Sequence, residues 1–285
     1  MRFLIHPIGS HGDVLPFIGL GKALQARGHD VHMYIHPPFA NEASEAGLAF
    51  TSLGELEDYE RVVRDPKLVH SRKIHHVLAE ATLESVPLAY QAMRDDLQSS
   101  STVVIGTSLS FACRLIQEKY ANRAVTVHFS PVVFRSNIQP ARMSEFKVDA
   151  PAFMRPFLWS LVDRWMADPL YAHGLNKYRA ELGLPPVKNL FRDWIHGADV
   201  VVGMFPEWFA QKQADWPAHA SLTSFPLYDH GDGASLPGEV RSFLDAGEAP
   251  IGFTPGTFTA TASRFFKVSI EALDRPSICP SLASK

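Results

Sequence analysis

The chain alternates short apolar runs with stretches in which apolar residues recur at helical spacing. The short runs predict buried strands, and the periodic stretches predict helices. The predicted strands are a run that begins at residue 2 and the runs 31–35, 48–51, 102–106, 124–129 and 199–204. The predicted helices are 14–27, 41–46, 75–97, 111–120, 152–166, 175–182, 239–246 and 265–273, and the charged stretch 55–73 predicts an irregular segment. Strands that alternate with helices in this way predict an α/β fold with a Rossmann-like, doubly wound parallel sheet.

The turn after the first strand gathers several polar groups at one point of the predicted fold. It reads Gly9-Ser10-His11-Gly12-Asp13. Gly9 and Gly12 permit a turn whose backbone approaches a ligand closely. Open α/β sheets bind their ligands at the carboxyl ends of the strands, which is where this turn lies, so we expect Gly9, Ser10 and Gly12 to bind substrate. Asp13 or His11 could act there as a general base toward a substrate hydroxyl, although Asp13 could equally serve as a helix cap.

Two further segments contribute candidate substrate-binding residues. Thr107 and Ser108 follow the strand 102–106, so a parallel sheet places them at the same edge as the first turn. Phe134 begins a loop-like stretch, and Trp159 lies in the aromatic-rich helix 152–166. Large apolar residues of this kind are most often core, but they could instead line a pocket for an apolar substrate.

A dinucleotide-dependent oxidoreductase would have a broadly similar pattern of strands and helices. Its fingerprint requires G-x-G-x-x-G and an acidic residue about 20 positions further on, at the end of the second strand. Here the turn has two glycines, and the second strand ends at Ile35 and His36 without a carboxylate. The oxidoreductase interpretation is therefore disfavoured.

Composition excludes several other classes of protein. The 285 residues are 46% hydrophobic and 20% charged, as in a soluble globular protein, and the net charge of −3 offers no basic surface for nucleic acid. No apolar stretch has the length of a membrane span or of a signal-peptide core. We therefore expect a cytoplasmic protein, with peripheral contact to a membrane surface left open.

Histidine and cysteine residues do not suggest a metal site. His75 and His76 are neighbours, so they point to different sides of a helix, and neither they nor His70 has a Cys or carboxylate that completes a ligand set. We expect solvated histidines. Cys113 and Cys279 fit a buried thiol and a thiol near the end of the chain, in a reducing compartment.

The opening stretch also resembles a known family. The pattern Gly-Ser-x-Gly-Asp-Val-x-Pro-Phe-x-x-Leu at residues 9–20 resembles the start of bacterial GT-B glycosyltransferases of the UDP-glycosyltransferase superfamily, family 1. The aromatic and proline-rich path 205–229 is similar to the close of their acceptor domain, most nearly in the rhamnosyltransferases of rhamnolipid synthesis. The resemblance implies that Asp13 is the base that deprotonates the acceptor, with His11 as second choice. Plant members carry a supporting Asp near the position of Thr107, which this sequence lacks, so a His–Asp dyad is not expected.

The same resemblance implies a domain organisation. Residues 1–228 would form the acceptor-binding domain, residues 229–247 the linker, and residues 248–285 a truncated start of the nucleotide-sugar-binding domain. Residues 250–257 look like the first strand and loop of that second domain, with Gly256 and Thr257 near the donor diphosphate. The His-x-Gly-Gly-type loop with which the family grips the nucleotide sugar is absent from this sequence.

These observations lead to one principal expectation and two alternatives. The principal one is an inverting glycosyltransferase that moves a sugar from a UDP- or dTDP-linked donor to a hydroxyl of a hydrophobic lipid or natural-product acceptor, with no metal and no cofactor beyond this co-substrate. One alternative is a truncated, non-catalytic acceptor domain that binds a ligand or a partner, and the other is a sugar-nucleotide epimerase. Apolar surface left exposed by a missing second domain would favour a homodimer.

Overall fold

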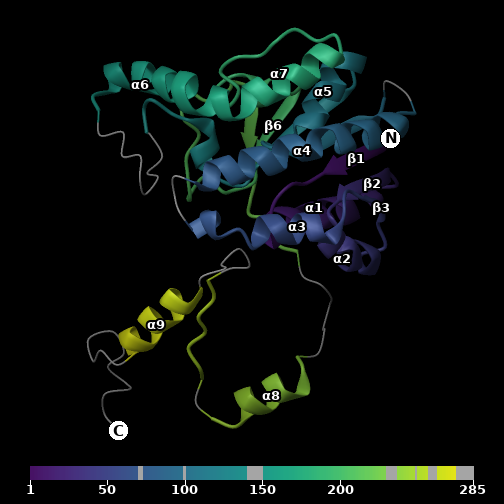
Figure 1. Cartoon of the computed structure of the whole chain (residues 1–285). Coiled ribbons are helices and arrows are strands. Elements are labelled where there is room, and N and C mark those ends of the chain that lie inside the picture. Colours follow the sequence, from purple (N-terminus) through teal and green to yellow (C-terminus); the bar gives the residue numbers. More distant parts are fainter. Residues whose placement is uncertain are drawn as a thin grey trace.

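The fold is built on one sheet of seven parallel strands (Figure 1). The computed structural model describes residues 1–69, 73–98, 101–139, 150–228, 236–247, 249–255 and 262–273. The strands are β1 (Arg2–His6), β2 (Asp30–Ile35), β3 (Ala49–Ser52), β4 (Val103–Thr107), β5 (Arg123–His128), β6 (Val200–Gly203) and β7 (Ala220–Leu222). Their order in the sheet is β3-β2-β1-β4-β5-β6-β7, so the expected Rossmann-like α/β architecture is confirmed.

Helices connect and cover these strands. The α-helices are α1 (His11–Gln25), α2 (Ala40–Glu45), α3 (Leu56–Val63), α4 (Ile74–Asp95), α5 (Phe111–Tyr120), α6 (Arg155–Val162), α7 (His173–Glu181), α8 (Gly238–Asp245) and α9 (Ala262–Leu273). Short 3₁₀ turns lie at Pro37–Phe39, Pro66–Val69, Pro131–Phe134, Ala152–Met154 and Trp194–His196. None of the helices within the described residues is long and apolar enough to cross a membrane.

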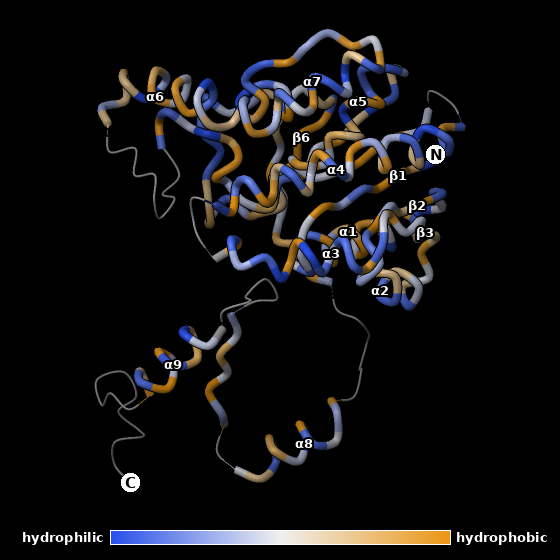
Figure 2. Tube along the Cα trace, in the orientation of Figure 1, coloured by the Kyte–Doolittle hydropathy of each residue, from blue (hydrophilic) through white to orange (hydrophobic). Residues whose placement is uncertain are grey.

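Each face of the sheet carries its own hydrophobic core, because alternate side chains of a strand point to opposite faces. Leu4 and Val104 pack on one face with residues of α4 and α5, whereas Ile5 and Ile105 pack on the other with residues of α1. Figure 1 shows α4, α5 and α7 on one side of the sheet and α1 and α2 on the opposite side. Hydrophobic residues run along the central strands, while α4 mixes both kinds of residue (Figure 2). The sheet is thus covered on both faces, as a parallel sheet requires.

The strand order reverses between β1 and β4, and this point positions the candidate site. His6 at the end of β1 pairs with Gly106 near the end of β4, so the loops that follow these strands lie side by side. The Ser110 hydroxyl donates a hydrogen bond to the His6 carbonyl at 2.5 Å and joins the two loops. In doubly wound sheets the crevice at such a reversal is where ligands bind.

Two segments differ from the sequence-based expectation within this sheet domain. Residues 55–73 were expected to be irregular, but they contain α3, whose Leu56, Tyr59 and Val63 lie on one helical face. Many charged residues lie between these positions, so the short apolar stripe was not recognised as a helical pattern in the sequence. Strand β7 was not expected either, because its three residues lie within a proline-rich path and gain strand geometry only by pairing with β6.

The helical region between residues 152 and 181 is more continuous than expected. A π-helical stretch, Asp163–Ala172, joins α6 to α7 and includes most of the residues between the two predicted helices 152–166 and 175–182. Pro169 lies inside this stretch and has no backbone N–H to donate, so the regular α-helical ladder cannot pass through it. The helix therefore widens locally and continues.

A strand was expected near residues 250–257, but the described part of this range, residues 250–255, does not form one. Residues 249–255 have no strand, and α8 and α9 lie outside the layers of sheet and helices (Figure 1). A strand needs a neighbouring strand to pair its backbone groups. The described residues form no second sheet that this segment could join. Gly256, Thr257, His70 and Cys279 fall outside the described residues, whereas Cys113 is free and buried as expected.

Candidate functional site

The candidate site begins at the turn that joins β1 to α1. Ser10 is the N-cap of α1, and Asp13 is the third residue of that helix. The Asp13 carboxylate accepts hydrogen bonds through Oδ2 from the backbone N–H of Ser10 at 2.8 Å and from its hydroxyl at 3.1 Å. This is the carboxylate half of a capping box, so Asp13 does serve the start of the helix, as its alternative interpretation required. Capping fixes where the carboxylate lies and occupies only one of its oxygens.

Gly9 makes room for this carboxylate. Its φ of +138° lies in a region that other residues rarely adopt, and a β-carbon at this position would lie 2.2 Å from Asp13 Oδ2. The Asp13 side chain is therefore packed directly across the backbone of Gly9. Burial raises the pKa of Asp13, and the two hydrogen bonds from Ser10 oppose that rise. A carboxylate with a raised pKa is a stronger proton acceptor than an exposed one.

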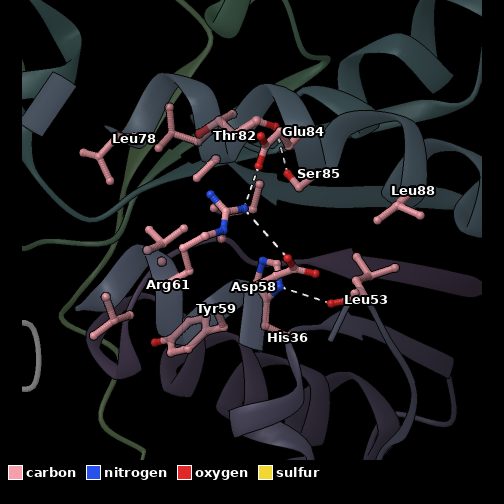
Figure 3. A pocket seen from close by; sticks show the side chains of 17 residues that line it. His36, Leu53, Asp58, Tyr59, Arg61, Leu78, Thr82, Glu84, Ser85 and Leu88 are labelled. Carbon is pink, nitrogen blue, oxygen red and sulfur yellow. Dashed lines mark hydrogen bonds and ion pairs between the residues drawn. The ribbon is translucent and has the colours of Figure 1, made fainter. Parts of the chain in front are cut away.

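A cavity of about 290 Å³ opens beside this turn (Figure 3). Its lining comes from the ends of three neighbouring strands, from α3 and α4, and from the loop after β4. The residues are Ile8, Gly9, His36, Leu53, Gly54, Asp58, Tyr59, Arg61, Val62, Val63, Leu78, Ala81, Thr82, Glu84, Ser85, Leu88 and Leu109. Gly9 is part of this wall, and the Asp13 carboxylate lies directly behind it, although Asp13 is not itself a lining residue. We call this space the Asp13 cavity.

The walls of the Asp13 cavity are mainly aliphatic, and its charged groups are concentrated at one place. Val62 and Val63 of α3 face Leu78, Ala81 and Leu88 of α4 across the space. Between the same two helices, Arg61 Nη2 lies 3.0 Å from Glu84 Oε2 and 3.8 Å from Asp58 Oδ1 (Figure 3). Arg61 and Glu84 are both more than half exposed, so this ion pair lies at the solvent side of the cavity. The cavity therefore suits an apolar body that enters past a polar rim.

His36 provides a polar group within the cavity. Its Nδ1 lies 3.2 Å from the Leu53 carbonyl, which can only accept a hydrogen bond, so Nδ1 carries the proton. Burial lowers the pKa of His36, so the ring is neutral at physiological pH and Nε2 is left as a hydrogen-bond acceptor. Figure 3 shows the ring beside Asp58 and Tyr59. His36 can thus receive a hydrogen bond from a bound molecule.

Tyr59 links His36 to the Asp13 turn. Its ring centroid lies 5.8 Å from that of His36. Burial raises the pKa of Tyr59, and the charge of Asp13 raises it further, which places the phenol within electrostatic reach of that carboxylate. Tyr59 and His36 therefore form a polar part of the cavity wall, and Asp13 lies behind Gly9 within electrostatic reach of Tyr59.

The second candidate base, His11, points to a different part of the molecule. Its Nε2 lies 3.6 Å from Glu42 Oε1 on α2, and its ring packs edge-on against Phe39 at 5.0 Å. The structure therefore places Gly9 in the wall of the Asp13 cavity, Asp13 behind that wall and His11 against α2. Of the other predicted turn residues, Ser10 holds the carboxylate, and Gly12 is exposed in the first turn of α1.

Thr107 and Ser108 lie in the loop next to the cavity. The Thr107 N–H donates to the Ser110 hydroxyl at 2.9 Å, which shapes the turn into α5. Leu109, the residue after the predicted pair, contributes the side chain that lines the cavity. Thr107 and Ser108 themselves do not line the cavity, and their role in binding substrate stays a prediction.

Phe134 and Trp159 lie at another cavity, of about 310 Å³, whose lining shares no residue with the Asp13 cavity. Phe134 is 4% exposed and stacks on Trp216 with ring centroids 4.3 Å apart. It is therefore a core residue as well as a lining residue. The Trp159 ring has the Arg135 guanidinium 5.3 Å from its centroid. The structure places these two predicted residues together, but away from Gly9.

Several lining residues escaped sequence reasoning. Tyr59, Arg61 and Val62 lie on α3, which was not expected to form, and Leu78 and Leu88 lie on α4 without any distinguishing motif. His36 could have been found from the sequence, because it directly follows β2 and so lies at the edge of the sheet where ligands bind. No group of three or more His, Cys, Asp or Glu side chains in the described part of the chain is arranged to hold a metal ion. Gly256 and Thr257 are outside that part, so the donor-binding role remains a prediction.

The parallel sheet, the reversal at β1 and β4 and the strand-end site define an α/β protein with the Rossmann-like fold of GT-B glycosyltransferases. Residues 3–137 match the family model described as the glycosyltransferase family 28 N-terminal domain. The matched range contains β1 to β5 and all the residues that line the Asp13 cavity. The finer resemblance to family 1 and to rhamnosyltransferases remains a prediction.

Curated relatives and solved structures agree with this class. Glycosyltransferase GtfC of Amycolatopsis orientalis is 24% identical over 286 residues, which are 96% of this chain and 64% of the relative. The dTDP-epi-vancosaminyltransferase of the same organism is 24% identical over 283 residues, which cover 96% and 62%. The solved structure of the spinosyn forosaminyltransferase SpnP has a TM-score of 0.54 at 19% identity and covers 96% of this chain and 62% of that one. This chain therefore spans just under two thirds of the length of these relatives.

Proposed function

We propose that this chain is the acceptor-binding part of an inverting glycosyltransferase that moves a sugar from a nucleotide-sugar donor to a hydroxyl of a hydrophobic acceptor. One observation carries the proposal: the Asp13 carboxylate is held against Gly9, and Gly9 lines an aliphatic cavity. Similarity to glycosyltransferases over 96% of this chain supports the reaction class. The proposed domain organisation, with residues 1–228 as the acceptor domain, is supported by Tyr228, which returns to α1 and packs against Gly19.

In the proposed reaction Asp13 acts as the general base. Its carboxylate takes the proton of the acceptor hydroxyl while the hydroxyl oxygen attacks the anomeric carbon of the donor sugar. The bond from that carbon to the diphosphate oxygen breaks, and the nucleoside diphosphate leaves with the electron pair. Attack from the side opposite the leaving group inverts the anomeric configuration. The hydrogen bonds from Ser10 and the missing side chain at Gly9 hold the base in place for this step.

The chemistry of the Asp13 cavity suggests what the acceptor looks like. The aliphatic side chains of α3 and α4 would bury its apolar body. Neutral His36 would accept a hydrogen bond from a second polar group on the acceptor, distinct from the hydroxyl that reacts at Asp13. We therefore propose an apolar acceptor with at least two hydrogen-bond donors near one end, as in hydroxylated lipids and polycyclic natural products.

The donor is proposed from the relatives, since its predicted contacts at Gly256 and Thr257 lie outside the described residues. One relative is a dTDP-epi-vancosaminyltransferase, so a dTDP-linked sugar is the first donor to test and a UDP-linked sugar the second. Residues 248–285 would contribute the start of this donor site, after the linker 229–247.

The test is a transfer assay with a matched pair of variants. The purified chain is incubated with dTDP-glucose or UDP-glucose and hydroxylated lipids, sterols or flavonols, and glycosylated products are detected by mass spectrometry. Asp13→Asn keeps the size of the side chain but cannot take a proton, so the rate should fall about 100-fold or more. Asp95→Asn, at an exposed aspartate on α4, is the control and should keep the wild-type rate.

The outcomes separate transfer from binding. An Asp13→Asn variant that keeps most of its activity would remove Asp13 from the mechanism. A wild-type chain that binds these acceptors and transfers no sugar would contradict the transferase activity and would fit a ligand-binding domain instead.

A further inference from the structure

We propose that the cavity near Trp159 and Trp216 is a second binding site, which takes a neutral, hydroxyl-rich ring such as a pyranose sugar. This cavity of about 310 Å³ lies between the segment after β5, the start of α6 and the loops before β6 and β7. Its lining residues are Phe134, Arg135, Asn137, Pro156, Trp159, Arg192, Asp193, His196, Asp215, Trp216 and Pro217. We call it the tryptophan cavity. The proposal does not depend on the transferase activity assigned to the Asp13 cavity.

Buried polar atoms without partners converge on the tryptophan cavity. Trp159 Nε1, Trp216 Nε1, Asn137 Oδ1 and His196 Nε2 are all buried, and none has a hydrogen-bond partner among the described residues. Trp216 is only 7% exposed, so bulk water does not supply the missing bond to its indole. Buried polar groups are normally paired, and an unpaired group costs stability. Four such atoms in the lining of one cavity point to a bound molecule that pairs them.

The charges around the tryptophan cavity favour a neutral ligand. Arg135 forms an ion pair with buried Asp163, and Arg192 Nε lies 3.4 Å from Asp193 Oδ1. Asp215 accepts hydrogen bonds from the Ser136 hydroxyl at 2.8 Å and from the Asn137 N–H at 2.5 Å. The charged lining residues are therefore already matched with partners of their own. An ionic ligand would have to break these pairs, whereas a neutral one would not.

The unpaired atoms also define the hydrogen bonds that a ligand must make. The two indole N–H groups donate and need acceptors, whereas Asn137 Oδ1 accepts and needs a donor. A hydroxyl group both donates and accepts, so a ring with several hydroxyls can satisfy each of these atoms. An ionised carboxylate would leave Asn137 Oδ1 unpaired, and a hydrocarbon would leave all of these atoms unpaired.

Aromatic walls complete the match to a sugar. Phe134 and Trp216 stack with a 13° angle between their rings, and Trp159 contributes a further indole to the lining. A pyranose ring has apolar C–H faces and polar edges, which fit aromatic side chains and converging polar groups respectively. The volume is at the small end of the range of about 300–1,000 Å³ for ligand sites, which suits one sugar ring.

The test follows the tryptophan indole N–H signals by two-dimensional NMR in the full chain labelled with ¹⁵N. The probes are the methyl glycosides of D-glucose, D-mannose, D-galactose and L-rhamnose, with inorganic phosphate as the anionic comparison. At least one glycoside should shift the signals of Trp159 and Trp216 in a saturable way. Trp165 and Trp208, which are 73% and 80% exposed and line neither cavity, should not shift and are the internal controls. No shift at Trp159 and Trp216 with any of the four glycosides would overturn the proposal, and so would a saturable shift with phosphate.

A matched pair of variants tests the hydrogen bonds. Asn137→Leu removes the amide acceptor and keeps similar bulk, so sugar affinity should fall about fivefold or more, as expected when one hydrogen bond is lost. Asn41→Leu makes the same change at an exposed position of α2 and should leave the affinity unchanged. Equal sugar affinity in the two variants would contradict the assignment of Asn137. The NMR spectrum itself reports whether each variant is folded.

A further comparison identifies the source of the sugar ring. Methyl and octyl β-D-glucopyranoside carry the same ring and differ only in the group attached to it. Equal affinities would indicate a site for free sugars. Tighter binding of the octyl compound, below its micellar concentration, would indicate that the ring belongs to a glycosylated apolar molecule.

Discussion

The Asp13 carboxylate lies in the space that a side chain at position 9 would fill: a β-carbon on Gly9 would lie 2.2 Å from Asp13 Oδ2. The carboxylate can take its position only because residue 9 has no side chain. The two residues therefore form one unit with Ser10, in which the glycine provides the room, Ser10 provides the hydrogen bonds and the aspartate would act as the proposed base. Each part of that unit can be changed separately.

Gly9→Ala should abolish most transfer activity and leave the sheet intact. The new methyl group must displace the Asp13 carboxylate, and φ at position 9 disfavours any side chain. We expect a loss of about 100-fold in kcat/KM, measured in the transfer assay, because a misplaced base loses most of its effect. Gly28→Ala is the matched control, because Gly28 also has a positive φ but no atom lies within 4 Å of its added β-carbon. Similar activity losses in both variants would contradict a specific effect on Asp13.

The pH dependence of the transfer rate should show the titration of Asp13. The base acts only when it is deprotonated, so the rate should fall as the pH drops through the pKa of Asp13. Because burial raises that pKa, the fall should occur above the ordinary aspartate value of 3.8. Mutating Ser10 to Ala removes one of the hydrogen bonds that hold the pKa down, so the acidic limb should move to higher pH. A limb that stays in place in this variant would argue against Asp13 as the titrating group.

His36→Phe should weaken acceptor binding without changing the chemical step. The variant removes the hydrogen-bond acceptor from the Asp13 cavity and leaves Asp13 in place, so the KM for an acceptor with two donor groups should rise about tenfold at nearly constant kcat. An acceptor with a single hydroxyl makes no bond to His36 and should show no such rise. A fall in kcat alone would instead assign His36 to the chemistry.

Glu118 should be a main determinant of stability. It receives hydrogen bonds from Arg179 at 2.6 Å and from the indole of Trp194, and the Arg179 side chain is only 2% exposed. Glu118→Ala leaves this buried guanidinium without its carboxylate and should lower the free energy of unfolding by about 3 kcal/mol. Urea denaturation followed by circular dichroism measures the change. The control Glu60→Ala breaks an exposed pair with Arg64 at the end of α3 and should have little effect.

His6 should make the protein sensitive to acid. Burial lowers its pKa to about 3 from the usual 6.5, so the folded protein keeps it neutral where the unfolded chain protonates it. Between pH 6.5 and 3 the unfolded state then binds more protons, and stability falls as the pH falls, by up to about 1.4 kcal/mol per pH unit. His6→Phe removes this term, so its free energy of unfolding should depend less steeply on pH below 6.5. The exposed His76→Phe is the comparison, and an unchanged slope in His6→Phe would exclude His6 as the cause.

The sheet could be predicted from the sequence because each of its main strands is marked by a short apolar segment. The runs at residues 31–35 and 102–106 are short, apolar and flanked by turn formers, and they became β2 and β4 close to their predicted positions. The first turn was also readable, because Gly9 and Asp13 lie within five residues of each other. Strand β7 was not readable, since its strand geometry comes from pairing with β6 rather than from its own composition.

The walls of the Asp13 cavity could not be predicted, because they depend on how α3 and α4 lie in space. Val62 and Leu78 are separated in sequence by a segment without a motif, and nothing in either residue type signals that both face one cavity. The tryptophan cavity illustrates the same limit. Sequence reasoning named Phe134 and Trp159 as substrate-binding residues together with Gly9, whereas the structure places these two at a different cavity from Gly9.

The separation between the Asp13 turn and the helical walls of its cavity has an evolutionary consequence. The residues that would perform the reaction lie within one short turn, where Gly9 has no room for a side chain and Ser10 holds the Asp13 carboxylate. The residues that would choose the acceptor are mostly aliphatic side chains on α3 and α4, where substitutions alter shape and leave the turn untouched. Such a scaffold can diverge toward new acceptors by changing two helix faces, while the catalytic turn is inherited unchanged.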